Sequence, residues 1–228
     1  MGRLEAREER PQRVVGRVVD GGQTAVTVVL AEDLGRIMFF AEFATAVAGW
    51  VLEINPFDQP NVQEAKDTTN EVLEQYGRDG KLPAVEDADD DALRALLARL
   101  GPPHYFAILA YVEPSEELDR EVAALRKAVL DATGATTTFG YGPRFQHSTG
   151  QLHKGGPPTG VFLQLVHDGD EDVDVPGAGY SFRTLKNAQA TGDLETLRAH
   201  GLAAERVRLE GDPVAALREL TARVASML

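Results

Sequence analysis

The order of short apolar runs and longer amphipathic segments after residue 105 limits the folds that this chain can adopt. Short apolar runs predict strands, and apolar residues spaced by three or four predict helices. In chain order these patterns predict a strand at 105–112, a helix at 115–132, strands at 136–141 and 161–167, a helix at 182–200, a strand at 204–209 and a helix from Pro213. The order β-α-β-β-α-β predicts an α/β fold. It fits a ferredoxin-like arrangement and equally a small three-layer parallel sheet.

The segment before residue 77 has a different pattern. Two valine-rich runs at 13–19 and 24–30 flank a glycine-containing turn, which predicts a β-hairpin. Apolar residues in 32–52 have helical spacing and indicate a helix with a broad buried face. Two prolines in 53–60 end this helix, and Asn61 is positioned to cap a second helix that runs to Tyr76.

Three parts follow from these patterns. Residues 77–91 contain glycines, a proline and a run of aspartates, and a short apolar helix at 92–100 follows them. We therefore predict a first part at 1–76, an acidic linker and helix at 77–102, and an α/β domain at 103–228. The aspartates before the helix at 92–100 suit a helix amino terminus, which favours carboxylates, better than a metal site.

Composition restricts the partners of the chain. The 228 residues carry a formal charge of −13 and contain no cysteine. This charge disfavours nucleic acids and anionic membranes as partners, and the absence of cysteine excludes disulfides and thiolate catalysis. The amino terminus lacks the apolar core of a signal peptide, and we find no run near the roughly 20 apolar residues of a spanning helix. These features predict a cytoplasmic protein.

One long segment contains no acidic residue. Residues 132–167 have no Asp or Glu, although 36 acidic residues among 228 would place about six there if evenly spread. The segment holds cations, hydroxyls and glycines of the kind that bind phosphate or carboxylate. We predict an anion-binding loop, and the alternative is a tight connection between central strands whose buried neighbours exclude carboxylates. The candidate ligand-binding residues are Arg144, His147, Ser148, Thr149, His153 and Lys154.

Neither cofactors nor metals are predicted. The segment Gly140-Tyr-Gly-Pro143 lacks the third glycine of a dinucleotide fingerprint, and its proline removes an amide where a phosphate-binding helix would begin. His147 and His153 are six residues apart, a spacing that does not match a helical zinc site. Residues 168–174 resemble a calcium loop superficially, but Val173 replaces the required glycine.

A family resemblance is carried by residues 54–66, Ile-Asn-Pro-Phe-Asp-Gln-Pro-Asn-Val-Gln-Glu-Ala-Lys. This stretch resembles the signature near the end of the second sugar-isomerase (SIS-type) domain of phosphoglucose isomerases. The apolar segment 43–49 is similar to the helix that precedes it in that family. Residues 139–157 resemble the carboxy-terminal extension of bacterial bifunctional transaldolase/phosphoglucose isomerases. The resemblance implies that Lys66 is catalytic and that Gln59 contacts the phosphorylated end of a sugar.

The implied reaction is the interconversion of glucose 6-phosphate and fructose 6-phosphate, with no cofactor. In this family the lysine stabilises negative charge on the sugar oxygen. Glu42, Glu53 and Glu64 do not occupy the family's motif for the catalytic base, so activity would require an amino-terminal transaldolase/isomerase partner chain or domain. Two alternatives stay open: a non-catalytic sugar-phosphate-binding or assembly module, and a structural module that uses residues 13–52 to complete a partner's isomerase domain.

Overall fold

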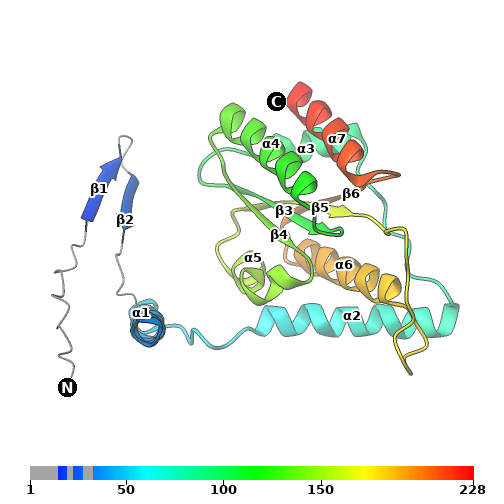
Figure 1. Cartoon of the computed structure of the whole chain (residues 1–228), viewed down its shortest axis with the longest axis horizontal. Coiled ribbons are helices and arrows are strands. Elements are labelled where there is room, and N and C mark those ends of the chain that lie inside the picture. The colour runs from blue at the N-terminus through cyan, green and yellow to red at the C-terminus, as the bar shows by residue number, and fades with distance from the viewer. Residues whose placement is uncertain (1–14, 20–22, 28–32) are drawn as a thin grey trace, which may run out of the picture. The chain divides into compact units, whose positions relative to one another are not determined.

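The computed structural model describes residues 15–19, 23–27 and 33–228, with side chains from residue 33 onward. The chain divides into two compact units, Met1–Asp58 and Gln59–Leu228 (Figure 1). The boundary therefore lies at the turn before the helix that begins with Pro60.

The described residues of the first unit form a two-stranded antiparallel sheet and one helix. Strands β1 (Val15–Val19) and β2 (Gln23–Thr27) pair with Val15 opposite Thr27, which confirms the predicted strands; the turn residues 20–22 lie outside the described residues. Helix α1 (Leu34–Leu52) confirms the predicted helix. The Asp33 side chain accepts a hydrogen bond from the Gly35 amide and so caps its amino terminus.

The prediction that α1 has a broad buried face is wrong for the described part of the first unit. Only Gly49 is buried in this helix, whereas Phe39, Phe43 and Trp50 are 70%, 61% and 80% exposed. The periodicity identified the helix correctly, but the described part of the unit contains too little structure to cover it.

The length of α1 also corrects a prediction. Among the described residues, α1 is the one helix long and apolar enough to cross a membrane, judged by length and composition alone. The prediction that the chain has no such segment is therefore wrong by this criterion. Arg36 and Glu42 lie within the helix, and the core helices of soluble domains satisfy the same criterion.

The second unit is built on a four-stranded sheet with the order β4-β3-β5-β6. Its strands are β3 (Tyr105–Tyr111), β4 (Thr136–Tyr141), β5 (Gly160–Val166) and β6 (Ala203–Arg208). All three strand pairs are parallel. A ferredoxin-like sheet has antiparallel pairs, so that alternative is wrong and the three-layer parallel sheet is the one observed. Parallel neighbours need a crossover between them, and here helices lie between consecutive strands.

Helices cover both faces of this sheet (Figure 1). Side chains of α3 (Asp90–Leu97), α4 (Glu116–Thr133) and α7 (Pro213–Met227) pack in one core with Phe106, Ile108 and Ala110 of β3. Ala107, Leu109 and Tyr111 belong to a second core on the opposite face, with side chains of α6 (Phe182–Ala199). Strand residues alternate between the two faces, so β3 is buried on both.

Helix α2 (Pro60–Asp79) packs along α6. Its N-cap residue is Gln59, whose side chain makes no capping hydrogen bond, so the prediction that Asn61 is the cap is wrong. Because α2 and α3 belong to the same compact unit as the sheet, the boundary predicted at 77–102 falls inside one unit. Two short elements were also not predicted: the 3-10 turn η1 (Arg144–His147) and α5 (Gly150–Gly155).

Close approach of α2 to α6 depends on Gly192. A β-carbon at this position would lie 2.7 Å from Thr69 Oγ1 and 2.9 Å from the Thr69 backbone nitrogen. We expect Gly192→Ala to destabilise the unit by about 1–3 kcal/mol, because the helices must separate to accept the methyl group. Urea denaturation followed by circular dichroism measures this change. The matched control is Gly77→Ala in α2, where a β-carbon meets nothing within 4 Å; equal effects of the two substitutions would contradict the packing argument.

Candidate functional site

A cavity of about 390 Å³ lies between α2, η1 and α6, and we call it the α2–α6 pocket. Helix α2 contributes a stripe of residues three or four positions apart, a spacing that places side chains on one helix face. The complete lining is Gln63, Lys66, Thr69, Asn70, Leu73, Pro143, Gln146, His147, Tyr180, Leu185 and Gln189. The pocket therefore brings predicted site residues Lys66 and His147 together across 81 positions of sequence, from 66 to 147.

The chemistry of the α2–α6 pocket is amide-rich and free of carboxylates. Among the described residues that line it, none is Asp or Glu, although the chain has 36. Four side-chain amides, a phenol, an imidazole and one ammonium face the same space. Amides and hydroxyls exchange hydrogen bonds with ligand hydroxyls, and Lys66 supplies the positive charge for an anionic group.

A second cavity, of about 560 Å³, lies at the carboxyl ends of β3 and β5. In open parallel sheets this edge is a common ligand site, because a crevice opens there at the point where the strand order reverses. Here the cavity is lined by two cationic residues, Arg183 and Lys186, and by five carboxylates. The carboxylates are those of Glu113, Asp168, Asp170, Glu171 and Asp172. The Lys186 ammonium donates to the backbone carbonyl of His167. An excess of carboxylates repels an anion, so the α2–α6 pocket is the better candidate for anionic ligands.

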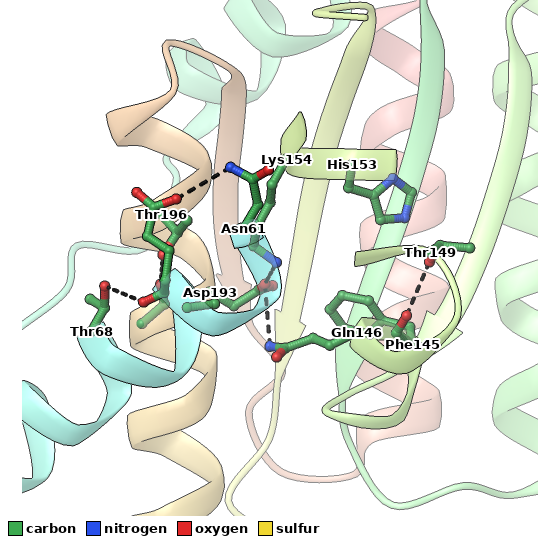
Figure 2. Close-up of polar contacts among 12 residues, drawn as sticks. Asn61, Thr68, Phe145, Gln146, Thr149, His153, Lys154, Asp193 and Thr196 are labelled. Atoms are coloured by element: carbon green, nitrogen blue, oxygen red, sulfur yellow. Dashed lines mark hydrogen bonds and ion pairs between the residues drawn. The ribbon is translucent and has the colours of Figure 1, made fainter. Parts of the chain in front are cut away.

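A buried ion pair lies beneath the α2–α6 pocket. Lys154 Nζ donates to Asp193 Oδ1 at 2.5 Å, and both side chains are 0% exposed (Figure 2). Gln146 Nε2 donates to the same carboxylate oxygen at 3.3 Å and to the Tyr111 hydroxyl at 3.1 Å. Burial raises the pKa of Asp193, and the neighbouring Lys154 charge opposes part of this shift. Gln146 therefore joins the pocket wall to a buried charge pair.

His153 is buried beside this network. One ring nitrogen lies 2.9 Å from the Tyr105 hydroxyl, and the ring packs against Phe145 and Phe162. Burial, and secondarily the Lys154 charge, lowers the pKa of His153 to about 4. The imidazole is therefore neutral near pH 7 and is held as a hydrogen-bonding core residue.

The structure separates the residues of the predicted anion-binding loop. Lys154 and His153 point into the protein interior, whereas the Arg144 guanidinium lies 5.6 Å from the centre of the Tyr141 ring. The hydroxyls of Ser148 and Thr149 both donate to the backbone carbonyl of Phe145. The segment is folded into η1 and α5, which turn successive side chains in different directions. Only His147 of these predicted residues lines the α2–α6 pocket.

Gln59 lies at the amino-terminal end of α2, is exposed, and is not among the residues lining the pocket. Besides Thr69, whose hydroxyl donates to the Ala65 carbonyl, five polar residues of the pocket were not predicted: Gln63, Asn70, Gln146, Tyr180 and Gln189. The first two lie three residues before and four after Lys66, so helical spacing could have identified them. The others come from η1, the segment before α6, and α6 itself, and only the tertiary fold brings them together.

Comparison with known proteins gives a partial relationship. The chain is 39% identical over 62 residues to a glucose-6-phosphate isomerase of Leptospira biflexa, which covers 25% of this chain and 14% of that protein. It is 36% identical over 63 residues to the Fusobacterium nucleatum glucose-6-phosphate isomerase and 33% over 81 residues to that of Lactobacillus helveticus. These matches cover 14% and 17% of the relatives' lengths. The chain thus contains a region related to glucose-6-phosphate isomerases.

No family model matches the sequence. Among solved structures, a hypothetical protein of Thermus thermophilus, TT0462, aligns with 75% of this chain and 44% of its own length, at 20% identity and a TM-score of 0.47.

The buried pair gives a test of how the site is held together. We expect Lys154→Met to destabilise the second unit by about 3–5 kcal/mol, because it leaves the Asp193 carboxylate buried without its cation. Replacing both residues, Lys154→Met with Asp193→Leu, should recover most of this loss. Urea denaturation of the single and double variants measures both effects. Lys127→Met is the matched control, since its pair with Asp131 is exposed and contributes at most about 1 kcal/mol.

His153 predicts a pH dependence of stability. Its pKa is about 4 in the folded protein and about 6.5 when unfolded, so the unfolded chain binds more protons between these values. Stability should therefore fall as the pH decreases from 7 through 5, with about 2 kcal/mol of the loss at pH 5 due to this residue. His153→Gln removes this contribution, so its free energy of unfolding should depend less on pH. Parallel pH profiles for the two proteins would contradict the assignment.

Proposed function

We propose that this chain is the carboxy-terminal part of a glucose-6-phosphate isomerase system and contributes Lys66 and Gln59 to the interconversion of glucose 6-phosphate and fructose 6-phosphate. The observation that carries the proposal is the 33–39% identity to glucose-6-phosphate isomerases from several bacteria. The motif at residues 54–66 supports it, and so does the position of Lys66 in a pocket without carboxylates. In this proposal the region up to residue 76 corresponds to the end of a sugar-isomerase domain.

The role of Lys66 follows from the chemistry of the reaction. Aldose–ketose isomerisation moves a proton between C1 and C2 and passes through an enediolate, whose oxygen carries negative charge. A fixed ammonium near that oxygen stabilises the transition state more than the neutral ground state. Gln59, at the start of the same helix, would contact the phosphorylated end of the sugar.

In this proposal the catalytic base comes from another polypeptide segment. Among the acidic residues that flank the motif, Glu42 and Glu53 do not occupy the family's motif for the base, and Glu64 is bonded to His200 at 2.8 Å. The hydrogen bond from His200 lowers the pKa of Glu64, which makes this carboxylate a weaker base. We therefore propose that an amino-terminal transaldolase/isomerase-type chain or domain supplies the base.

The exposed surface of α1 supports such a partner. Its large apolar side chains include Phe39, Phe43 and Trp50, and the matched regions account for only 14–17% of the relatives' lengths. A polypeptide that supplies the remaining part of an isomerase domain would cover these side chains. With a phosphorylated sugar as substrate, we place the system in the cytoplasm.

A second candidate function is a non-catalytic sugar-phosphate-binding module. The observation in its favour is that every residue lining the α2–α6 pocket belongs to the unit Gln59–Leu228. Ligand binding would then require neither the first unit nor a partner. The two candidates differ in turnover, since the module binds a sugar phosphate without converting it.

Substitution of Lys66 tests the catalytic proposal. In a complex of this chain with its partner, we expect Lys66→Ala to lower the rate of fructose 6-phosphate isomerisation about 100-fold or more, because the developing oxyanion loses its cation. A coupled assay of glucose 6-phosphate formation measures this rate. Lys81→Ala, an exposed substitution with the same charge change outside the pocket, is the control. Normal turnover with Lys66→Ala would exclude the proposed role of Lys66. Absence of turnover in the wild-type complex would favour the binding module.

A further inference from the structure

The amide of Gln146 has a fixed direction. This residue is only 9% exposed, yet it lines the α2–α6 pocket. Its Nε2 donates to the Tyr111 hydroxyl and to Asp193 Oδ1. A side-chain amide has two N–H donors and one carbonyl acceptor. Because Nε2 serves two buried acceptors, the carbonyl oxygen Oε1 is the atom that Gln146 has left for a ligand.

The ion pair beneath the pocket prevents the amide from turning over. Asp193 is fully buried and bonded to Lys154, and an ionised carboxylate can only accept hydrogen bonds. Turning the Gln146 amide by 180° would place its Oε1 against the Asp193 carboxylate, with two acceptors facing each other. In a buried environment this repulsion is strong. The pair Lys154–Asp193 therefore imposes an acceptor on this part of the pocket wall.

We propose that the α2–α6 pocket is a binding site for a polyhydroxylated anion, in which one ligand hydroxyl donates to Gln146 Oε1 and Lys66 lies beside the sugar oxygen that becomes negatively charged in the reaction. The proposal deepens the proposed function and rests on it for the choice of probe. It assigns roles to Gln146, as the acceptor of a hydroxyl proton, and to Asp193, as a positioning residue that acts through Gln146. The resemblance to isomerases assigns neither role.

Size and composition of the pocket agree with this class of ligand. Its volume of about 390 Å³ lies within the range of roughly 300–1,000 Å³ typical of small-molecule sites. The side chains of Gln63, Asn70 and Gln189 add further groups that can donate to or accept from hydroxyls. The carboxylate-free lining leaves the charge of Lys66 available within the pocket.

The experiment uses the full chain without a partner and measures binding of glucose 6-phosphate by isothermal titration calorimetry. Each sugar hydroxyl is then replaced in turn by hydrogen or by fluorine in a series of analogues. Fluorine cannot donate a hydrogen bond, so at the position that faces Gln146 both replacements should weaken binding by roughly 3- to 10-fold. In Gln146→Leu the parent sugar phosphate should bind that much more weakly, and the penalty for the two replacements should disappear.

Further variants separate ligand contact from folding. Gln189→Leu alters the pocket without touching the ion pair and should also weaken binding, whereas Gln75→Leu, on α2 but outside the lining residues, should leave it unchanged. The double variant Lys154→Met with Asp193→Leu frees the Gln146 amide to turn. It should still bind glucose 6-phosphate but should discriminate less between hydroxyl and fluorine at the sensitive position. A purely structural role of the pair would leave that discrimination intact.

Three results would overturn the proposal. The first is that the chain alone does not bind glucose 6-phosphate. The second is that the wild type, Gln146→Leu and Lys66→Ala all bind it with equal affinity. The third is that the hydroxyl and fluorine forms bind equally well at every position of the sugar. These outcomes differ from failure of the catalytic proposal. Binding without turnover in the presence of a partner would retain the site and reject the isomerase role. Turnover in the complex without binding by the chain alone would reject the proposed binding site and retain the isomerase role.

Discussion

The ion pair between Lys154 and Asp193 is the interaction on which the candidate site depends. It joins α5 to α6 beneath the α2–α6 pocket, and both charges are completely buried. Removing two charges from water is costly, and only good geometry and additional hydrogen bonds offset that cost. Gln146 supplies one of those bonds from η1. The pair thus contributes little to stability compared with an apolar replacement, but it determines which face of the Gln146 amide meets the pocket.

The fold was largely predictable because its local signals agree with its tertiary structure. Strand β3 is a continuous apolar run because both of its faces are covered, and α4 is capped by Ser115, whose hydroxyl accepts from the Leu118 amide. Strand direction was not predictable. The string of elements is the same for parallel and antiparallel sheets, and the short helix α5 between β4 and β5 has too few residues for a clear periodicity.

The candidate site was predicted only in part, and the reason is the same for each error. The acid-free segment predicted an anion-binding loop, but its cation Lys154 obtains its carboxylate from position 193 on α6. Sequence proximity therefore suggested that Lys154 was free to bind a ligand, whereas a partner 39 residues away neutralises it. Lys66 was identified through a family motif, and His147 through the composition of its segment; no sequence signal connected either one to Gln189. Pairing across the fold, rather than residue type, decides which polar groups reach the pocket.

Electrostatics explain how a chain with a formal charge of −13 can present a pocket suited to an anion. Carboxylates gather at the carboxyl edge of the sheet, where five of them line one cavity, while the described residues around the α2–α6 pocket include none. The two cavities lie in one compact unit, so a ligand near this unit experiences the electrostatic fields of the residues around both cavities. An anion is repelled from the sheet edge and, at short range, attracted by Lys66. Because salt screens the repulsion from distant charges more than a contact inside the pocket, net charge opposes the approach of an anion but does not prevent the proposed binding.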